Sequence, residues 1–132
     1  MKIIDGKNAT LGRLASYAAK EALKGEEVII VNCADIIITG SRQNIRKDFL
    51  ISRSRVGSSQ KGPKISRNID RIVKRTIRGM LPNHRWGKGK ESFERIKCFV
   101  GTPKEYENAK KLISGKEKKN KFIQIKELSR LS

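Results

Sequence analysis

The side chains best suited to chemistry in this sequence are cations that recur at helical spacing. When residues 69–80 are wound at about 100° per residue, one side of the helix carries Arg71, Lys74, Arg75 and Arg78. The other side carries the apolar residues Ile69, Ile72, Val73, Ile77 and Met80. Arg and Lys donate hydrogen bonds to phosphate oxygens, and Arg does so in pairs. The pattern therefore predicts an anion-binding face on a helix whose opposite face is anchored in a core.

A basic loop is predicted after this helix, because a proline at position 82 makes continuation of the helix costly. Residues 83–90, NHRWGKGK, contain three cations, one indole and two glycines: Arg85, Trp86, Gly87, Lys88, Gly89 and Lys90. The Trp86 ring would stack on an unpaired base or a sugar, as in proteins that hold single-stranded or irregular RNA. It would equally suit the edge of a core, and the glycines would either allow close backbone approach or only form a turn.

Further cations come from the segments that precede this helix. Ser41 is placed to cap a helix with a modest apolar side, Ile45, Phe49 and Leu50. Residues 56–68, VGSSQKGPKISRN, have no apolar periodicity and form either a linker or a loop that orders against phosphate, which is the interpretation we prefer. The candidate RNA-binding residues of these two segments are Arg42, Arg46, Arg53, Arg55, Lys61, Lys64 and Arg67.

The charge of the chain points to a polyanionic partner. Thirty-one Lys and Arg against thirteen Asp and Glu give +18, and such a charge opposes folding by self-repulsion unless a polyanion neutralises it. Residues 1–40 carry five basic and five acidic side chains and have no net charge. Residues 41–95 carry sixteen basic and four acidic side chains, a net charge of +12. Residues 96–132 carry ten and four, a net charge of +6. This concentration favours a neutral scaffold with a binding surface over a uniformly basic solvated surface.

A membrane-binding protein is the competing class for so basic a chain. No stretch approaches the roughly 18 consecutive apolar residues of a spanning helix, and the basic segments lack the exposed bulky apolar faces of interfacial helices. The first residues, MKIIDGKNAT, contain no apolar signal-peptide region. We therefore expect a cytoplasmic protein without a membrane partner.

Residue types that perform catalysis are present but not in catalytic patterns. His84, the single histidine, lies in a basic loop without a carboxylate to orient it as a general base. Cys33 and Cys98 occupy apolar strand-like contexts without the spacing of a metal site, and we expect buried thiols. Close carboxylate pairs fall at strand starts, beside the basic loop or in a first helical turn: Glu26 and Glu27, Glu91 and Glu94, Glu105 and Glu107. No catalytic residue, metal or cofactor is predicted.

A nucleotide site at the first helix is the enzyme hypothesis that the sequence leaves open. A strand followed by a helix that begins at Thr10 is the setting of many phosphate-binding loops. The sequence there, DGKNATLGR, has neither GxGxxG nor GxxxxGK[ST]. A small-molecule substrate is therefore not expected.

The elements that must position the cations begin with a strand, a helix and a strand. Residues 2–5 form the first strand and Asp5-Gly6 a turn; Thr10 caps a helix that Lys24-Gly25 ends. The apolar stripe of that helix is Leu11, Leu14, Ala15, Ala18, Ala22 and Leu23. Residues 27–32 are a β-branched run typical of a strand covered on both faces. This order predicts a right-handed βαβ unit and a parallel sheet.

Shorter elements complete the expected domain. Residues 36–39 form a strand or the mouth of a turn, and residues 96–100 form a strand. The sequence TPKE at residues 102–105 has the form of a capping box and predicts a helix from residue 103 to about residue 114. We expect a single domain over residues 1–115, and over residues 116–132 a basic extension that packs on the domain or on a partner through Phe122, Ile123 and Ile125.

The runs DRIVKRTIRGMLP and FERIKCFVGTP resemble the universal large-subunit ribosomal protein family thirteen in its archaeal and eukaryotic form. IIDGKNATLGRLAS, EEVIIVNCADIIITG and FIQIKELSRLS are also similar to that family, so the resemblance covers nearly the whole chain. It implies a three-layer α/β/α domain with a four-stranded, mainly parallel sheet and basic RNA-binding loops. It also implies contacts to ribosomal RNA from Arg71, Lys74, Arg75, Arg78 and the loop through Lys90.

The function expected from residues and resemblance together is that of a non-enzymatic component of the large ribosomal subunit, active in translation. Its partners would be large-subunit ribosomal RNA, which it would stabilise early in assembly, and neighbouring ribosomal proteins. Because side chains cannot read the deep groove of A-form RNA, recognition would depend on shape and backbone. The alternatives are an RNA-binding translational regulator outside the ribosome and a nucleotide-binding α/β enzyme.

Overall fold

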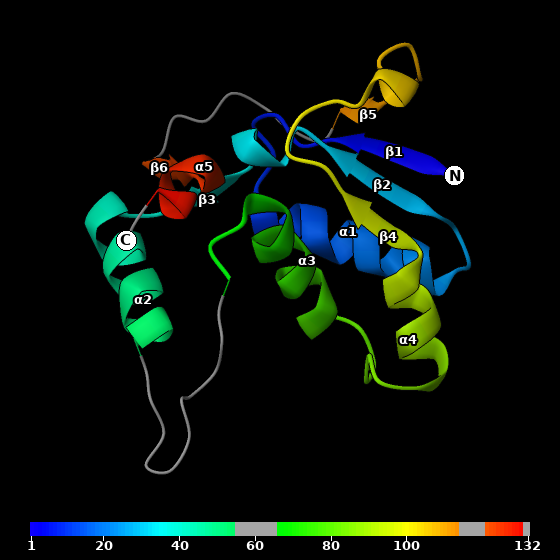
Figure 1. Ribbon diagram of the computed structural model, residues 1–132, viewed down its shortest axis with the longest axis horizontal. Coiled ribbons are helices and arrows are strands. Elements are labelled where there is room, and N and C mark those ends of the chain that lie inside the picture. The colour runs from blue at the N-terminus through cyan, green and yellow to red at the C-terminus, as the bar shows by residue number, and fades with distance from the viewer. Residues whose placement is uncertain (55–65, 114–120, 131–132) are drawn as a thin grey trace.

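The computed structural model describes residues 1–54, 66–113 and 121–130 of the chain. At its centre is a parallel sheet with the strand order β4-β2-β1-β5 (Figure 1). The strands are β1 (Lys2–Asp5), β2 (Val28–Val31), β4 (Ile96–Cys98) and β5 (Leu112–Ile113). The α/β class predicted from the sequence is therefore confirmed.

The unit β1-α1-β2 has the predicted parallel connection. Helix α1 (Leu11–Leu23) starts after Thr10, whose hydroxyl makes no capping bond, and is followed by Gly25 with a φ of 98°. The two strands pair in register, with Ile3 opposite Ile29. All four residues of β2 are buried, as expected for a β-branched run covered on both faces.

The apolar stripe of α1 faces the main core, with one correction at its end. Leu11, Leu14, Ala15, Ala18 and Ala22 are buried as predicted, and Ala19 joins them. Leu23 is 44% exposed, so its assignment to the stripe was wrong. Twelve residues after Leu11, it lies about 120° round the helix from that residue. A side chain at that angle points past the core.

Three helices cover one face of the sheet. Figure 1 shows α1, α3 (Ile69–Gly79) and α4 (Gly87–Glu94) on the same side of the strands, and α3 contacts both α1 and β4. Val73 and Ile77 are completely buried in the main core. Met80, predicted on the same face, is 44% exposed because α3 ends at Gly79.

Helix α4 corrects the prediction of a loop through residue 90. The helix begins at Gly87 and includes Gly89, which is buried. A Cβ atom at Gly89 would collide with the carbonyl oxygens of Pro82 and Asn83. Glycines lower intrinsic helix propensity, and here one of them is required because the first turn of α4 lies directly on the preceding backbone.

The second face of the sheet is covered without an α-helix in the described ranges. Ile3, Ile29 and Val31 form a small core there with Phe99, Tyr106 and Ala109 packed against it. The predicted helix from residue 103 is replaced by a short 3-10 helix, η2 (Lys104–Tyr106), and then by β5. The Thr102 hydroxyl, expected to cap that helix, donates instead to Asn32 Oδ1 at 3.0 Å. The capping-box prediction was therefore wrong.

A second sheet joins the C-terminal residues to the middle of the chain. Strand β3 (Ile37–Thr39), reached through the 3-10 helix η1 (Cys33–Asp35), pairs antiparallel with β6 (Phe122–Gln124), and α5 (Ile125–Ser129) follows. Ile123 and Ile125 are completely buried and Leu128 is 2% exposed. The ambiguous segment 36–39 is thus a strand, and the last described residues pack on the chain itself (Figure 1).

Helix α2 (Arg42–Ser54) starts directly after Ser41, as predicted, and has no buried residue. It contacts β6. Arg55, Lys61, Lys64, most of the predicted loop 56–68 and the basic tail 116–120 lie outside the described residues.

Candidate nucleic-acid interface

Helix α3 presents cations on the side opposite its buried residues. Arg71 and Arg75 are exposed, while Lys74 and Arg78 are half-buried. Val73 and Ile77 fix the helix in the core from the other side. The segregation predicted from the 3.6-residue period is therefore present. A charged face held by a rigid, buried face positions its donors without further ordering.

The four cations of α3 line one groove, which we call the α2–α3 groove. Its volume is about 470 Å³. The lining side chains come mainly from α2 and α3, with one from α4; besides the four cations they are Phe49, Ser52, Ser66, Ile72, Thr76 and Phe93. No acidic residue of the described chain is among them. The groove therefore combines a cationic rim with aromatic and apolar walls.

One of these cations is held in place by an aromatic ring. Lys74 Nζ lies 4.8 Å from the ring centroid of Phe93, within the range of a cation–π contact. The Phe93 ring in turn lies 6.1 Å from the His84 ring at a tilted angle of 56°. His84 therefore packs beside the basic face, and the structure gives it no carboxylate partner among the described residues.

The predicted RNA-binding residues of α2 also have structural contacts. Arg42 Nε donates to the Phe122 carbonyl at 3.1 Å, and Arg46 forms an ion pair with Glu127 at 3.1 Å. Both arginines are nevertheless exposed on the helix. Arg53 is half-buried one turn beyond Phe49. These contacts orient α2 through its first turns and leave Arg42 and Arg46 exposed.

The segment 83–90 keeps its basic character although half of it is helical. Arg85, Lys88 and Lys90 are exposed, and the Asn83 side chain accepts a hydrogen bond from the Arg85 N–H at 3.0 Å. Trp86 is 66% exposed immediately before α4. The alternative that Trp86 covers the core edge was therefore wrong, and its ring is open to a partner.

Two groove residues were missed as candidates by the sequence reasoning. Phe49 was assigned only to a modest apolar side, and Phe93 was not singled out. Phe49 follows Arg46 and Lys47 with Asp48 between, and Phe93 lies between Lys90 and Arg95 with Glu94 as its direct neighbour. Aromatic residues interleaved with cations are the pattern that would have identified them.

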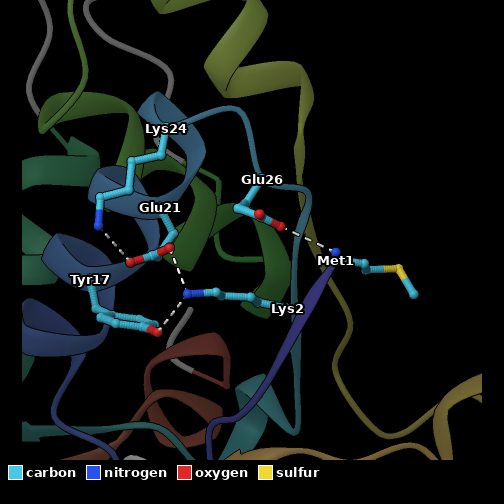
Figure 2. Close-up of polar contacts among 6 residues, drawn as sticks. All are labelled: Met1, Lys2, Tyr17, Glu21, Lys24 and Glu26. Atoms are coloured by element: carbon cyan, nitrogen blue, oxygen red, sulfur yellow. Dashed lines mark hydrogen bonds and ion pairs between the residues drawn. The ribbon is translucent and has the colours of Figure 1, made fainter.

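The one buried carboxylate among the described residues belongs to an ion cluster and not to a catalytic pair. Glu21 is 5% exposed, and its oxygens lie 2.7 Å from Lys2 Nζ and 3.5 Å from Lys24 Nζ (Figure 2). Tyr17 completes the cluster with a 3.5 Å hydrogen bond from Lys2. The hydrogen bond from Lys2 lowers the pKa of Glu21, so this carboxyl stays ionised and cannot act as a general acid near neutrality.

The two thiols are neighbours without a disulfide. Cys33 is buried, as predicted, whereas Cys98 is only half-buried. The pKa of Cys33 is raised, first by its hydrogen bond with Cys98 and then by burial. No group of three His, Cys, Asp or Glu side chains in the described ranges could hold a metal ion. No helix within those ranges is long and apolar enough to cross a membrane.

Comparison with known proteins gives the family. The model described as "Ribosomal protein L13" matches residues 1–105. "Large ribosomal subunit protein uL13" of Methanocaldococcus jannaschii is 44% identical over 133 residues, covering 98% of this chain and 96% of that protein. The protein of the same name from Methanococcoides burtonii is 41% identical over 135 residues, again covering 98% of this chain and 96% of that protein. The protein from Methanosarcina barkeri is 46% identical over 106 residues, which cover 80% of this chain and 74% of that protein.

These relatives are archaeal ribosomal proteins and not enzymes, which confirms the predicted archaeal-type resemblance and the predicted lack of enzymatic activity. The family model begins at residue 1 and extends through α3, α4 and β4, so it includes the basic face described above. The chain therefore belongs to the ribosomal protein L13 family.

Proposed function

We propose that this protein is a structural component of the large ribosomal subunit, where it binds and stabilises large-subunit ribosomal RNA from an early stage of assembly. The observation that carries the proposal is α3, whose Val73 and Ile77 are completely buried while Arg71 and Arg75 on the opposite side are exposed. Its membership in the L13 family and its net charge of +18 support the same partner.

The proposed contacts are mainly to phosphates, with one aromatic contact. Cations on rigid elements fix the register and orientation of an RNA without reading its sequence. Trp86, exposed beside Arg85, would stack on an unpaired base. The proposed RNA-binding residues are Arg42, Arg46, Arg53, Arg55, Lys61, Lys64, Arg67, Arg71, Lys74, Arg75, Arg78, Arg85, Trp86, Lys88 and Lys90.

Neighbouring ribosomal proteins are the second proposed class of partner. We also propose the division into a domain of residues 1–115 and an extension of residues 116–132. An RNA-binding regulator acting outside the ribosome is the alternative function, and it requires a pool of free protein.

Sucrose-gradient fractionation of a lysate tests the proposal. The protein should sediment with the large subunit and with its assembly intermediates, and it should be released by high salt because phosphate contacts are salt-dependent. Its absence from the large-subunit fractions would overturn the proposal. A substantial fraction at the top of the gradient at low salt would favour the regulatory alternative.

A further inference from the structure

We propose that the α2–α3 groove holds one unpaired base of the bound RNA, with the flanking phosphates on the cations of α3. This inference rests on the proposed function and adds to it, because it assigns a base site to a surface otherwise expected to hold only backbone. A phosphate alone needs no aromatic wall. Phe49 of α2 and Ile72 of α3 both line the groove, and such apolar surface suits the flat face of a base.

The size of the groove fits such an occupant. Its volume of about 470 Å³ falls within the roughly 300–1,000 Å³ of pockets that bury small ligands. Its walls come from α2 and from α3, so a base entering between them would leave its sugar and phosphates near the rim. Arg71, Arg75 and Arg78 line that same groove, at the positions where they can bind those phosphates.

Phe49 is the ring available for stacking. The Phe93 ring is already occupied, since Lys74 Nζ lies 4.8 Å from its centroid. Within the part of the chain that the structure describes, neither a ring nor a cation stacks on Phe49. Phe49 is also only half-buried on a helix that has no buried residue. The two aromatic residues therefore have different roles: Phe93 positions a cation, and Phe49 receives the base.

Hydroxyl groups in the walls can bond the edge of a base. The Ser66 oxygen accepts a hydrogen bond from the Asn68 N–H at 3.1 Å, which leaves its hydrogen free to donate. The Thr76 hydroxyl donates to the Ile72 carbonyl at 3.1 Å, which leaves its oxygen free to accept. Donor, acceptor and cations together match a nucleotide, whereas an apolar side chain of a neighbouring protein would leave them without partners.

The test uses three hairpin RNAs with the same stem. One is fully paired, one has a single bulged adenosine, and one has an abasic ribose at the bulge, which keeps the phosphate charge and removes the base. Their affinities for the full chain are measured by fluorescence anisotropy at several salt concentrations. The variants are Phe49→Ala, Phe49→Tyr and, as a matched control on the same helix, Leu50→Ala, whose side chain is 37% exposed and outside the groove. Circular dichroism melts verify that each variant is folded.

The unmodified chain should prefer the bulged adenosine over the abasic bulge by about 5- to 150-fold, the range that stacking of one base on an aromatic ring gives. Phe49→Ala should reduce this ratio to about 1, while Phe49→Tyr and Leu50→Ala should keep it. A ratio near 1 for the unmodified chain, or a ratio that survives Phe49→Ala, overturns the base site; the second result would indicate that the base stacks on another ring, such as the exposed Trp86. Salt-independent or absent binding of all three RNAs would instead refute the proposed function.

Discussion

Replacing Arg71, Arg75 and Arg78 together by alanine should flatten the salt dependence of RNA binding without unfolding the protein. All three side chains line the α2–α3 groove, and none has an ion pair within the described residues. Their removal therefore costs the fold no such contact. What it removes, if the proposed function is correct, is a set of phosphate partners.

The size of the effect follows from counterion release. Each phosphate contact contributes about 0.7 to 0.9 to the slope of log affinity against log salt concentration. Three lost contacts should lower that slope by roughly 2.1 to 2.7. Over a fourfold increase in salt, the unmodified chain should then lose about 20 to 40 times more affinity than the triple variant.

Filter binding to large-subunit ribosomal RNA, measured across a salt series, provides the assay. The matched control replaces Lys7, Arg13 and Lys20, which are exposed cations on and near α1, and changes the net charge by the same amount. Its slope should change little. Equal changes in both triple variants would show that only total charge matters, and an unchanged slope in the α3 variant would show that this face is turned away from RNA.

The remaining predictions concern stability. Ile77→Ala, at a completely buried position, should lower the free energy of unfolding by about 2–5 kcal/mol, whereas Met80→Ala, at a 44% exposed position, should change it by less than about 0.5 kcal/mol; similar thermal shifts for both would contradict the assigned core. Gly89→Ala should weaken the packing of α4 on the preceding backbone, and a melting temperature like that of the unmodified chain would refute this. Since Lys2 lowers the pKa of Glu21 below its usual value of 4.5, that stabilisation is present above the usual value and lost as pH falls through the lowered one. The urea midpoints of the unmodified chain and Glu21→Gln should therefore converge as the pH falls through the lowered pKa of Glu21, and a constant difference would disprove the linkage.

The sequence correctly predicted those helices and strands whose residue pattern lies within one segment of the chain. The unbroken run of β2 and the alanine stripe of α1 each specify an element and its buried face, and together they fix a parallel βαβ connection. The cationic side of α3 follows from the same periodicity. The resemblance added the family, which no periodicity could give.

The errors arose where a distant contact outweighed a local preference. Residues 102–105 form a good capping sequence, but the Thr102 hydroxyl bonds to Asn32, seventy positions away in the chain. The first turn of α4 contains two glycines, and its helix exists because Gly89 fits against the backbone of residues 82–83. Neither contact can be inferred from the spacing of nearby residues. The secondary structure of both segments was therefore predicted from local propensity alone.

The basic face itself depends on such distant contacts. Helix α2 has no buried residue, so the burial of apolar side chains contributes little to its position. The hydrogen bond from Arg42 to the Phe122 carbonyl and the ion pair of Arg46 with Glu127 tie it to the C-terminal strand and helix, which are anchored by the buried Ile123 and Ile125. One wall of the α2–α3 groove is therefore positioned by residues about eighty positions further along the chain. Since surface ion pairs contribute little energy each, that wall is the part of the proposed RNA-binding surface most able to adjust to the RNA, while α3 remains fixed in the core.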